Sequence, residues 1–109
     1  MRLLLFLLCF LLHSLATCFA GEIYGSITEG GKAVGAGLKV SVRCAKGSYP
    51  ATTDNYGSYR LIAAEQGKCE LRLEYKGQSP AIEVFSYEES ARYDLIVESQ
   101  KGSYLLKRK

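Results

Sequence analysis

One stretch of the sequence decides the fold class: Thr52-Thr53-Asp54-Asn55-Tyr56-Gly57-Ser58-Tyr59-Arg60-Leu61. Asp54 suits the first position of a type I turn, because its carboxylate can accept hydrogen bonds from backbone N–H groups. Gly57 suits the fourth position, where the chain often needs a positive φ. Strand-favouring residues such as Tyr59 lie on both sides. The stretch predicts a β-hairpin in which Asp54, Gly57 and Tyr59 are structural residues.

Period-two alternation of apolar and polar residues dominates the chain after residue 21. In residues 38–44, Leu, Val, Val and Cys alternate with Lys, Ser and Arg, which is typical of a half-buried strand. Pro50 favours an edge position for its strand. The expected strands span residues 23–27, 38–44, 49–53, 58–63, 69–75, 81–85, 92–98 and 103–107. This pattern predicts an all-β fold, a seven- or eight-stranded antiparallel β-sandwich.

The first 20 residues have the composition of a signal peptide. Arg2 is a short positive n-region, an unbroken apolar run follows, and small residues precede a cleavage site after Ala20. We predict cleavage there, and export of the protein to the periplasm or the medium. Two alternatives stay open: an uncleaved N-terminal membrane anchor, or a lipid anchor on Cys18, because residues 15–18 are close to a bacterial lipobox. Residues 21–98 would then form the sandwich, and residues 99–109 a final hairpin strand with a basic tail.

The two cysteines outside the leader are predicted to form a disulfide. Cys44 ends one expected strand and Cys69 begins another, each on the apolar face. A single pair in a small exported domain is usually bridged. Two free buried thiols are the alternative, and a two-cysteine metal site is disfavoured.

The sequence contains few residues that could act as catalytic groups. The only histidine, His13, lies in the leader, so the mature chain lacks Ser-His-Asp and Cys-His catalysis and His-ligated metals. A glycosidase-type carboxylate pair stays formally open, but the acidic residues are scattered singly along expected strands and loops. We therefore expect no enzyme, no cofactor and no metal site.

The positive net charge belongs to the end of the chain. Residues 21–100 carry 9 Lys and Arg against 11 Asp and Glu, a net charge of −2, whereas the whole chain has +3. Lys107, Arg108 and Lys109 close the sequence, read either as a solvated end or as a contact to an anionic surface. Nucleic-acid binding needs a basic patch on the fold, and the sequence shows none.

Four segments together resemble the carboxypeptidase regulatory-like domain, a transthyretin-like (prealbumin-like) β-sandwich. They are Gly21-Glu22-Ile23-Tyr24-Gly25-Ser26-Ile27, Ala36-Gly37-Leu38-Lys39-Val40-Ser41-Val42, Thr52-Thr53-Asp54-Asn55-Tyr56-Gly57-Ser58-Tyr59 and Gly67-Lys68-Cys69-Glu70-Leu71-Arg72-Leu73. The cysteine pair is also similar to that of pollen-allergen sandwiches, which usually have further cysteines that are absent here. The resemblance implies a non-catalytic accessory module.

Two functional hypotheses follow. The first is an exported binding or structural module whose partner is a cell-envelope protein or polysaccharide. The second, more specific one is carbohydrate binding, because Tyr49, Tyr56 and Tyr87 lie at or near expected loops and exposed rings can stack on sugars. Against this, tyrosine favours strands and often packs with only its hydroxyl at the rim. An enzyme is the least favoured class.

Overall fold

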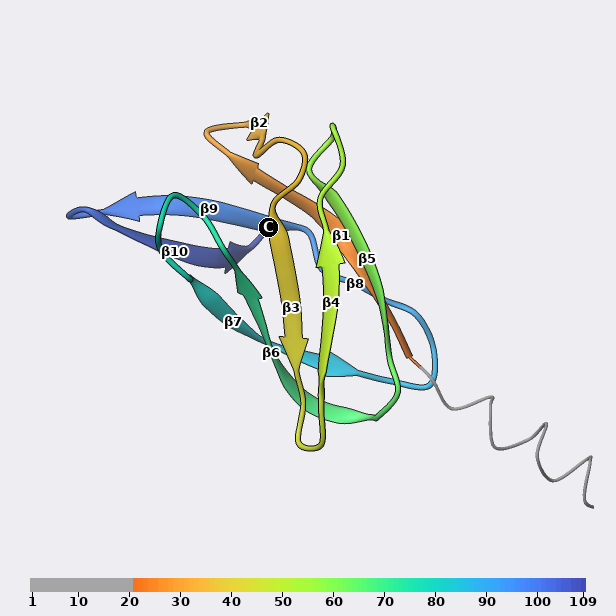
Figure 1. Ribbon diagram of the computed structural model, residues 1–109. Helices are drawn as coiled ribbons and strands as arrows, with labels where there is room; N and C mark the ends of the chain where they lie inside the picture. The colour runs from red at the N-terminus through yellow and green to blue at the C-terminus, as the bar shows by residue number, and fades with distance from the viewer. Residues whose placement is uncertain (1–20) are drawn as a thin grey trace, which may run out of the picture.

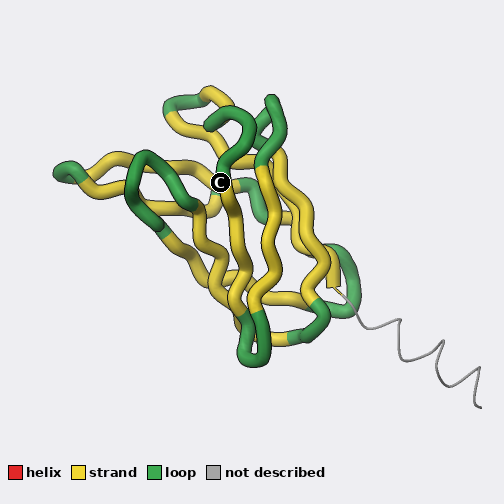
Figure 2. Tube along the Cα trace, in the orientation of Figure 1, coloured by secondary structure: helices red, strands yellow, loops and turns green. Residues whose placement is uncertain are grey.

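The computed structural model describes residues 21–109, which form two β-sheets packed face to face (Figure 1). The larger sheet contains β1 (Gly21–Glu29), β2 (Lys32–Ala33), β5 (Ser58–Ala63), β8 (Ala91–Arg92), β9 (Leu95–Gln100) and β10 (Ser103–Arg108). The smaller sheet has the order β4 (Ser48–Thr52), β3 (Lys39–Arg43), β6 (Gly67–Leu73) and β7 (Ala81–Ser86). Strands and loops account for the whole described chain (Figure 2), which confirms the all-β sandwich.

The predictions for the leader, including the cleavage after Ala20, the lipid anchor on Cys18 and the N-terminal membrane anchor, lie outside the described residues. Within residues 21–109 the structure has no helix that is long and apolar enough to cross a membrane.

Strand β1 is central in the larger sheet because it pairs with strands on both sides, and its alternate side chains point into the sandwich. Ile23 and Ile27 are fully buried. The first part of β1 pairs with β5, antiparallel, from Gly21 opposite Ala63 to Ser26 opposite Ser58. On its other side β1 pairs with β8 and then β9, and both of these pairings are parallel.

The prediction of a purely antiparallel sandwich is therefore wrong in this respect. The chain leaves the smaller sheet at the end of β7 and enters the larger sheet beside the start of β1, so β8 and β9 run in the same direction as β1. Apolar alternation sets which side chains face the core, but it carries no information on strand direction.

The turn at Asp54–Gly57 forms as predicted. The Gly57 N–H donates to the Asp54 carbonyl oxygen at 3.0 Å, and Gly57 has a φ of 70°. The Asp54 carboxylate accepts hydrogen bonds from the N–H groups of Tyr56 and Ser58, at 2.9 and 3.0 Å. The sequence signal for this turn was therefore correct in its local chemistry.

The predicted hairpin around this turn is wrong, because β4 and β5 belong to different sheets. Before the turn, the Thr53 N–H donates to the Leu38 carbonyl oxygen at 3.0 Å, next to β3. After the turn, the Gly57 carbonyl oxygen accepts from the Ile27 N–H of β1 at 2.9 Å. The turn is thus a corner at which the chain passes from one sheet to the other.

The four strands of the smaller sheet lie close to the segments that the sequence predicts as strands. Pro50 lies on β4, which is an edge strand of this sheet. Strands β3 and β6 pair antiparallel, with Arg43 opposite Glu70, so the next residues along meet and form the Cys44–Cys69 disulfide. The disulfide prediction is confirmed, and such bonds are typical of proteins that fold in oxidising compartments.

The predicted final hairpin strand forms as β10, while the side chains of Lys107, Arg108 and Lys109 are exposed to solvent. Strand β10 pairs antiparallel with β9, and Leu106 is buried between the sheets. The Lys107 ammonium is 2.9 Å from the Glu98 carboxylate. The Lys109 N–H donates to the Asp94 carbonyl oxygen at 2.9 Å, which fixes the last residue as well.

Candidate functional site

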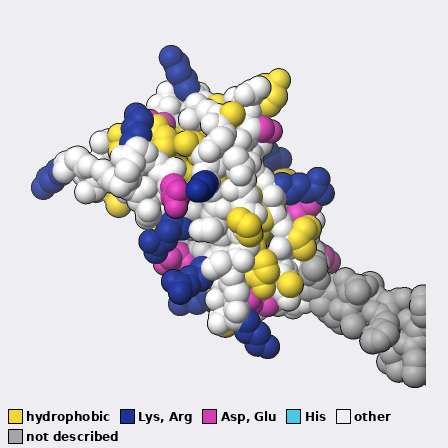
Figure 3. All heavy atoms as spheres, in the orientation of Figure 1, with side chains coloured by type: hydrophobic (Ala, Val, Ile, Leu, Met, Phe, Trp, Pro, Cys, Tyr) yellow, Lys and Arg dark blue, Asp and Glu magenta, His cyan; other side chains and the backbone are white. Residues whose placement is uncertain are grey.

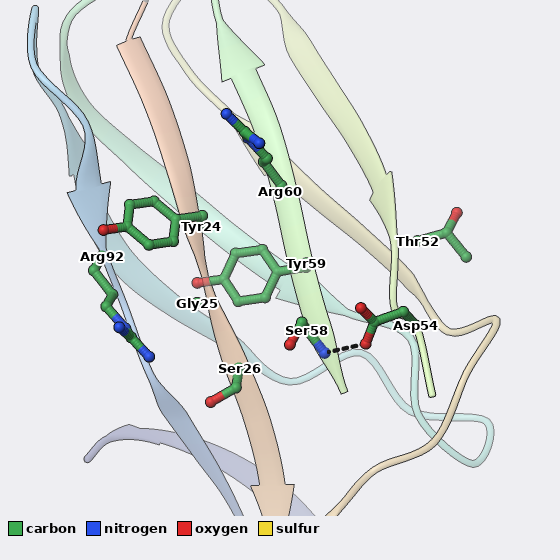
Figure 4. A pocket seen from close by; sticks show the side chains of 9 residues that line it. All are labelled: Tyr24, Gly25, Ser26, Thr52, Asp54, Ser58, Tyr59, Arg60 and Arg92. Atoms are coloured by element: carbon green, nitrogen blue, oxygen red, sulfur yellow. Dashed lines mark hydrogen bonds between the residues drawn. The ribbon is translucent and has the colours of Figure 1, made fainter. Parts of the chain in front are cut away.

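Three side chains form a row across the outer face of the larger sheet. Tyr24 on β1 lies opposite Arg60 on β5 and, on the other side, opposite Arg92 on β8. The Cζ atom of Arg92 is 5.9 Å from the centroid of the Tyr24 ring, within cation–π range. Figure 4 shows the Tyr24 ring directed toward Arg92. We call these three residues the arginine–tyrosine row.

Each arginine of the row is held by a carboxylate. Arg60 forms an ion pair with Glu22, whose other oxygen accepts a hydrogen bond from the Ser90 hydroxyl at 2.9 Å. Nε of Arg92 lies 3.0 Å from Oδ2 of Asp94. Both arginine side chains are largely exposed, so the guanidinium N–H groups that these pairs do not use face solvent.

Asp94 lies at a break between β8 and β9, where the sequence predicts one continuous strand. Its Oδ1 atom accepts hydrogen bonds from the Ser26 N–H at 3.0 Å and from the Ser26 hydroxyl at 3.2 Å. A side-chain carboxylate thus replaces a strand carbonyl as the acceptor for β1. Burial works to raise the pKa of Asp94, but hydrogen bonds from Arg92 and Ser26 outweigh it and hold the pKa below its usual value.

The break is stabilised from inside the sandwich by Tyr59. Its buried hydroxyl donates to the Tyr93 carbonyl oxygen at 2.6 Å. That oxygen lies so close to β1 that a Cβ atom at residue 25 would be 2.0 Å from it, which explains why Gly25 is a glycine. From the core side of the sheet, Tyr59 therefore helps to hold the backbone on which Arg92 and Asp94 lie.

A depression of about 460 Å³ lies over this row. We call it the tyrosine groove. It is lined by Tyr24, Gly25, Ser26, Thr52, Asp54, Ser58, Tyr59, Arg60 and Arg92 (Figure 4). The groove combines one half-buried aromatic ring with guanidinium and hydroxyl groups, and Asp54 at its rim is already bound to the turn backbone. Such a set suits recognition of a polar ligand that has a flat apolar face.

Asp94, next to Arg92 at the edge of the groove, lacks the pKa shift that a glycosidase acid needs. Glycoside hydrolysis needs a carboxylic acid with a raised pKa, beside a second, ionised carboxylate. The pKa of Asp94 is shifted in the opposite direction, so Asp94 stays ionised near neutral pH. Within residues 21–109 there is also no group of three or more His, Cys, Asp or Glu side chains that could hold a metal ion.

The structure does not bring together the three tyrosines that the sequence suggested for sugar stacking. Tyr49 lies on edge strand β4, and its hydroxyl donates to Glu65 at 2.9 Å. Tyr87 follows β7 at the opposite edge of the same sheet and stacks on Phe85, with ring centroids 6.3 Å apart. Tyr56 is 79% exposed, at the tip of the corner between the sheets. The three residues therefore form no common platform.

The arginine–tyrosine row was not predicted as a site. Period-two alternation does place Glu22, Tyr24 and Ser26 on one face of the first strand. The two arginines, however, come from segments far along the chain, and only the strand order places them beside Tyr24. The position of the two arginines beside Tyr24 could not be predicted without knowing how β1 pairs with β5 and β8.

Charges of both signs are spread over the surface. Figure 3 shows Lys and Arg side chains distributed around the viewed face, with acidic side chains among them. Several are paired across strands, such as Lys68 with Glu83 at 3.0 Å. On this face no large basic area forms of the kind that nucleic-acid binding uses.

Comparison with known proteins shows the fold. No protein-family model and no curated protein matches the chain. Among solved structures, it is similar to the Bacillus anthracis TIE protein, with a TM-score of 0.58 and 17% identity over 71% of this chain. It is also similar to a candidate carbohydrate binding protein from Bacteroides uniformis, with a TM-score of 0.51 and 22% identity over 80% of this chain. The chain spans 16% and 52% of the lengths of these two proteins, and at these identities the likeness shows a shared fold.

Proposed function

We propose that this protein is an exported, non-catalytic carbohydrate-binding module of the cell envelope, whose ligand lies in the tyrosine groove. The observation that carries the proposal is the arginine–tyrosine row. The Tyr24 ring offers a flat surface to the apolar face of a sugar ring, and the flanking guanidinium groups offer hydrogen-bond donors to its hydroxyl groups.

The ion pairs of the row support this reading. Glu22 and Asp94 hold the two arginines before any ligand arrives, so less side-chain entropy is lost on binding. The carboxylates offset part of the charge of the arginines, whose remaining N–H groups can still donate hydrogen bonds to a sugar. A groove prepared in this way is typical of recognition rather than of simple surface solvation.

The wider context agrees with this role. The Cys44–Cys69 disulfide supports an exported protein. We further infer that the sandwich is of the carboxypeptidase regulatory-like type that its sequence resembles, a family of non-catalytic accessory modules. A carbohydrate ligand is also what the description of the Bacteroides uniformis protein names for that protein.

Binding to a panel of polysaccharides tests the proposal. The protein, purified from an export-competent host, is assayed by affinity electrophoresis and calorimetry against starch, xyloglucan, pectin, chitin oligosaccharides and peptidoglycan. We expect at least one to bind, and Tyr24→Ala to weaken that binding by about fivefold or more.

Tyr56→Ala is the matched control, because Tyr56 is the most exposed tyrosine and lies outside the groove. It should bind like the wild type. No binding to any member of the panel would contradict a carbohydrate function and favour a structural or protein-binding module. Loss of binding in Tyr56→Ala with full binding in Tyr24→Ala would place the site elsewhere.

A further inference from the structure

A second depression lies beside the tyrosine groove and shares Arg92 with it. It has a volume of about 380 Å³ and is lined by Arg92, Asp94, Arg108 and Lys109. Three of these side chains are cationic and one is a carboxylate. Arg92 therefore lines both hollows, one of which holds the Tyr24 ring and the other the end of β10.

Asp94 cannot neutralise all of these cations. Its Oδ1 atom already accepts three hydrogen bonds, from the Ser26 N–H, the Ser26 hydroxyl and Nε of Arg92, and its Oδ2 atom lies 3.0 Å from the same Nε. Only Nε of Arg92 is used in these contacts. Across residues 21–109 the terminal Nη groups of Arg92 have no hydrogen-bond partner in the protein, and they are the pair that binds an external carboxylate in a bidentate manner.

The other two cations are unpaired. The guanidinium carbon of Arg108 lies 4.7 Å from the centroid of the Tyr93 ring, so the side chain is held by a cation–π contact. Lys109 is tied to the break between β8 and β9 by its backbone bond to the Asp94 carbonyl oxygen. In the part of the chain that the structure describes, neither side chain forms an ion pair.

We propose that the ligand is an acidic polysaccharide, a chain of uronic-acid type. One sugar ring lies on Tyr24, and the carboxylate of a neighbouring residue lies between Arg92, Arg108 and Lys109. This inference rests on the proposed carbohydrate function and specifies its ligand class.

A polysaccharide fits these observations better than an anionic membrane does. The cations line a hollow that shares Arg92 with the groove in which the Tyr24 ring lies, so a ligand that contacts both hollows must be extended. The neighbouring cation Lys107 lies 2.9 Å from the Glu98 carboxylate, which adds a negative charge beside the cations. A membrane-binding patch would need several unpaired basic residues on one exposed plane.

Polygalacturonic acid and its methyl ester provide the main test, because they share a sugar backbone and differ in charge. We expect the full exported protein to bind the acid form about fivefold or more tightly than the ester at low salt. The difference should shrink as salt is raised, because salt screens exposed charges. Equal affinity for the two forms, or no salt dependence, would overturn the inference.

The double variant Arg108→Gln/Lys109→Gln tests the residues. It should lose about three- to tenfold of its affinity for the acid form and keep its affinity for the ester. Lys39→Gln/Arg43→Gln removes the same two charges from exposed positions of β3, on the other sheet, and is expected to bind both forms like the wild type. Melting temperatures check that each variant is folded, and the salt dependence of the wild type gives an independent readout if one is not.

The outcomes separate this inference from the proposed function. Tyr24-dependent binding of neutral polysaccharides with no preference for the acid form would leave the carbohydrate function standing and reject the acidic ligand. Binding of no polysaccharide in either form would reject both. Binding to phosphatidylglycerol vesicles that Arg108→Gln/Lys109→Gln abolishes, with no binding of polygalacturonic acid, would assign the cations to a membrane surface instead.

Discussion

Tyr24 and Arg92 lie directly opposite each other on the parallel strands β1 and β8, with Cζ of Arg92 5.9 Å from the centroid of the Tyr24 ring. The parallel register of β1 and β8 sets this pairing, and at the break after β8 the Asp94 carboxylate accepts from Ser26 and pairs with Arg92. The Arg92 guanidinium group, held by Asp94 at this break, therefore lies within cation–π range of the Tyr24 ring. The predictions below test the contacts that maintain this break and the fold around it.

Asp94→Asn should destabilise the protein at neutral pH and have less effect in acid. The folded state holds the pKa of Asp94 below its usual value, so the ionised carboxylate contributes stability above about pH 4. That contribution is lost as the pH falls through the lowered pKa. We expect the variant to lose about 0.5–1.5 kcal/mol of unfolding free energy at pH 7 and clearly less at pH 2.5, measured by urea denaturation.

Glu74→Gln is the control for this prediction, since Glu74 is exposed and forms no ion pair within residues 21–109. It should unfold like the wild type at both pH values. An Asp94→Asn effect that is as large at pH 2.5 as at pH 7 would show that the charge of Asp94 does not contribute.

Gly57→Ala should cost about 2–4 kcal/mol, more than a positive φ alone explains. Gly57 has a φ of 70°, and a Cβ atom there would lie 2.5 Å from the Ile27 carbonyl oxygen. Gly30 also has a positive φ, 59°, but a Cβ atom there would meet nothing within 4 Å. Gly30→Ala should therefore cost only about 1 kcal/mol, which is the backbone strain without the clash.

Thermal and urea denaturation of the two glycine variants measure this difference. Equal losses in Gly57→Ala and Gly30→Ala would contradict the close approach of the corner to β1, and would leave only the backbone conformation as the reason for a glycine at position 57.

Removing the disulfide should destabilise the sandwich without changing its fold. The Cys44–Cys69 bridge closes a loop with a sequence separation of 25. The chain-entropy model gives about 2–4 kcal/mol for such a loop, so the double variant Cys44→Ala/Cys69→Ala should unfold at a correspondingly lower urea concentration. Two thiols that react with an alkylating agent in the native, non-reduced protein would contradict the bridge.

The sequence was sufficient for features that depend on local chemistry. The turn signal of Asp54 and Gly57, the alternation in residues 38–44 and the edge position of Pro50 all depend on neighbouring residues, and each was predicted correctly. The Cys44–Cys69 disulfide could also be predicted, because a single cysteine pair in a small exported domain is usually bridged.

The pairing of strands that lie far apart in the sequence could not be predicted in the same way. Nothing in residues 52–61 shows that the strands on either side of the turn belong to different sheets, since the bonds that separate them go to Leu38 and Ile27. The same holds for the arginine–tyrosine row, where Arg92 meets Tyr24 only through a parallel pairing across most of the chain. Side-chain alternation repeats every two residues in either strand direction, so it could not distinguish these arrangements.

Tyr59→Phe should weaken both the stability of the sandwich and the geometry of the tyrosine groove. The Tyr59 hydroxyl is buried and donates to the Tyr93 carbonyl oxygen at 2.6 Å, directly below the break that positions Arg92. Removing the donor leaves that carbonyl without this bond, which costs about 1–2 kcal/mol. Burial, with the nearby charge of Asp94, also raises the pKa of Tyr59 well above its usual value.

The raised pKa gives this last prediction a second readout. The neutral hydroxyl stabilises the folded state below about pH 10, the usual pKa of tyrosine, and this stabilisation decreases as the pH rises further. The difference in unfolding free energy between the wild type and Tyr59→Phe should therefore be full at pH 7 and smaller at pH 11. Tyr24→Phe is the control, because in the described chain the Tyr24 hydroxyl has no protein partner, and its stability should match the wild type at both pH values. A Tyr59→Phe variant as stable as the wild type at pH 7 would show that the break between β8 and β9 does not depend on this hydrogen bond.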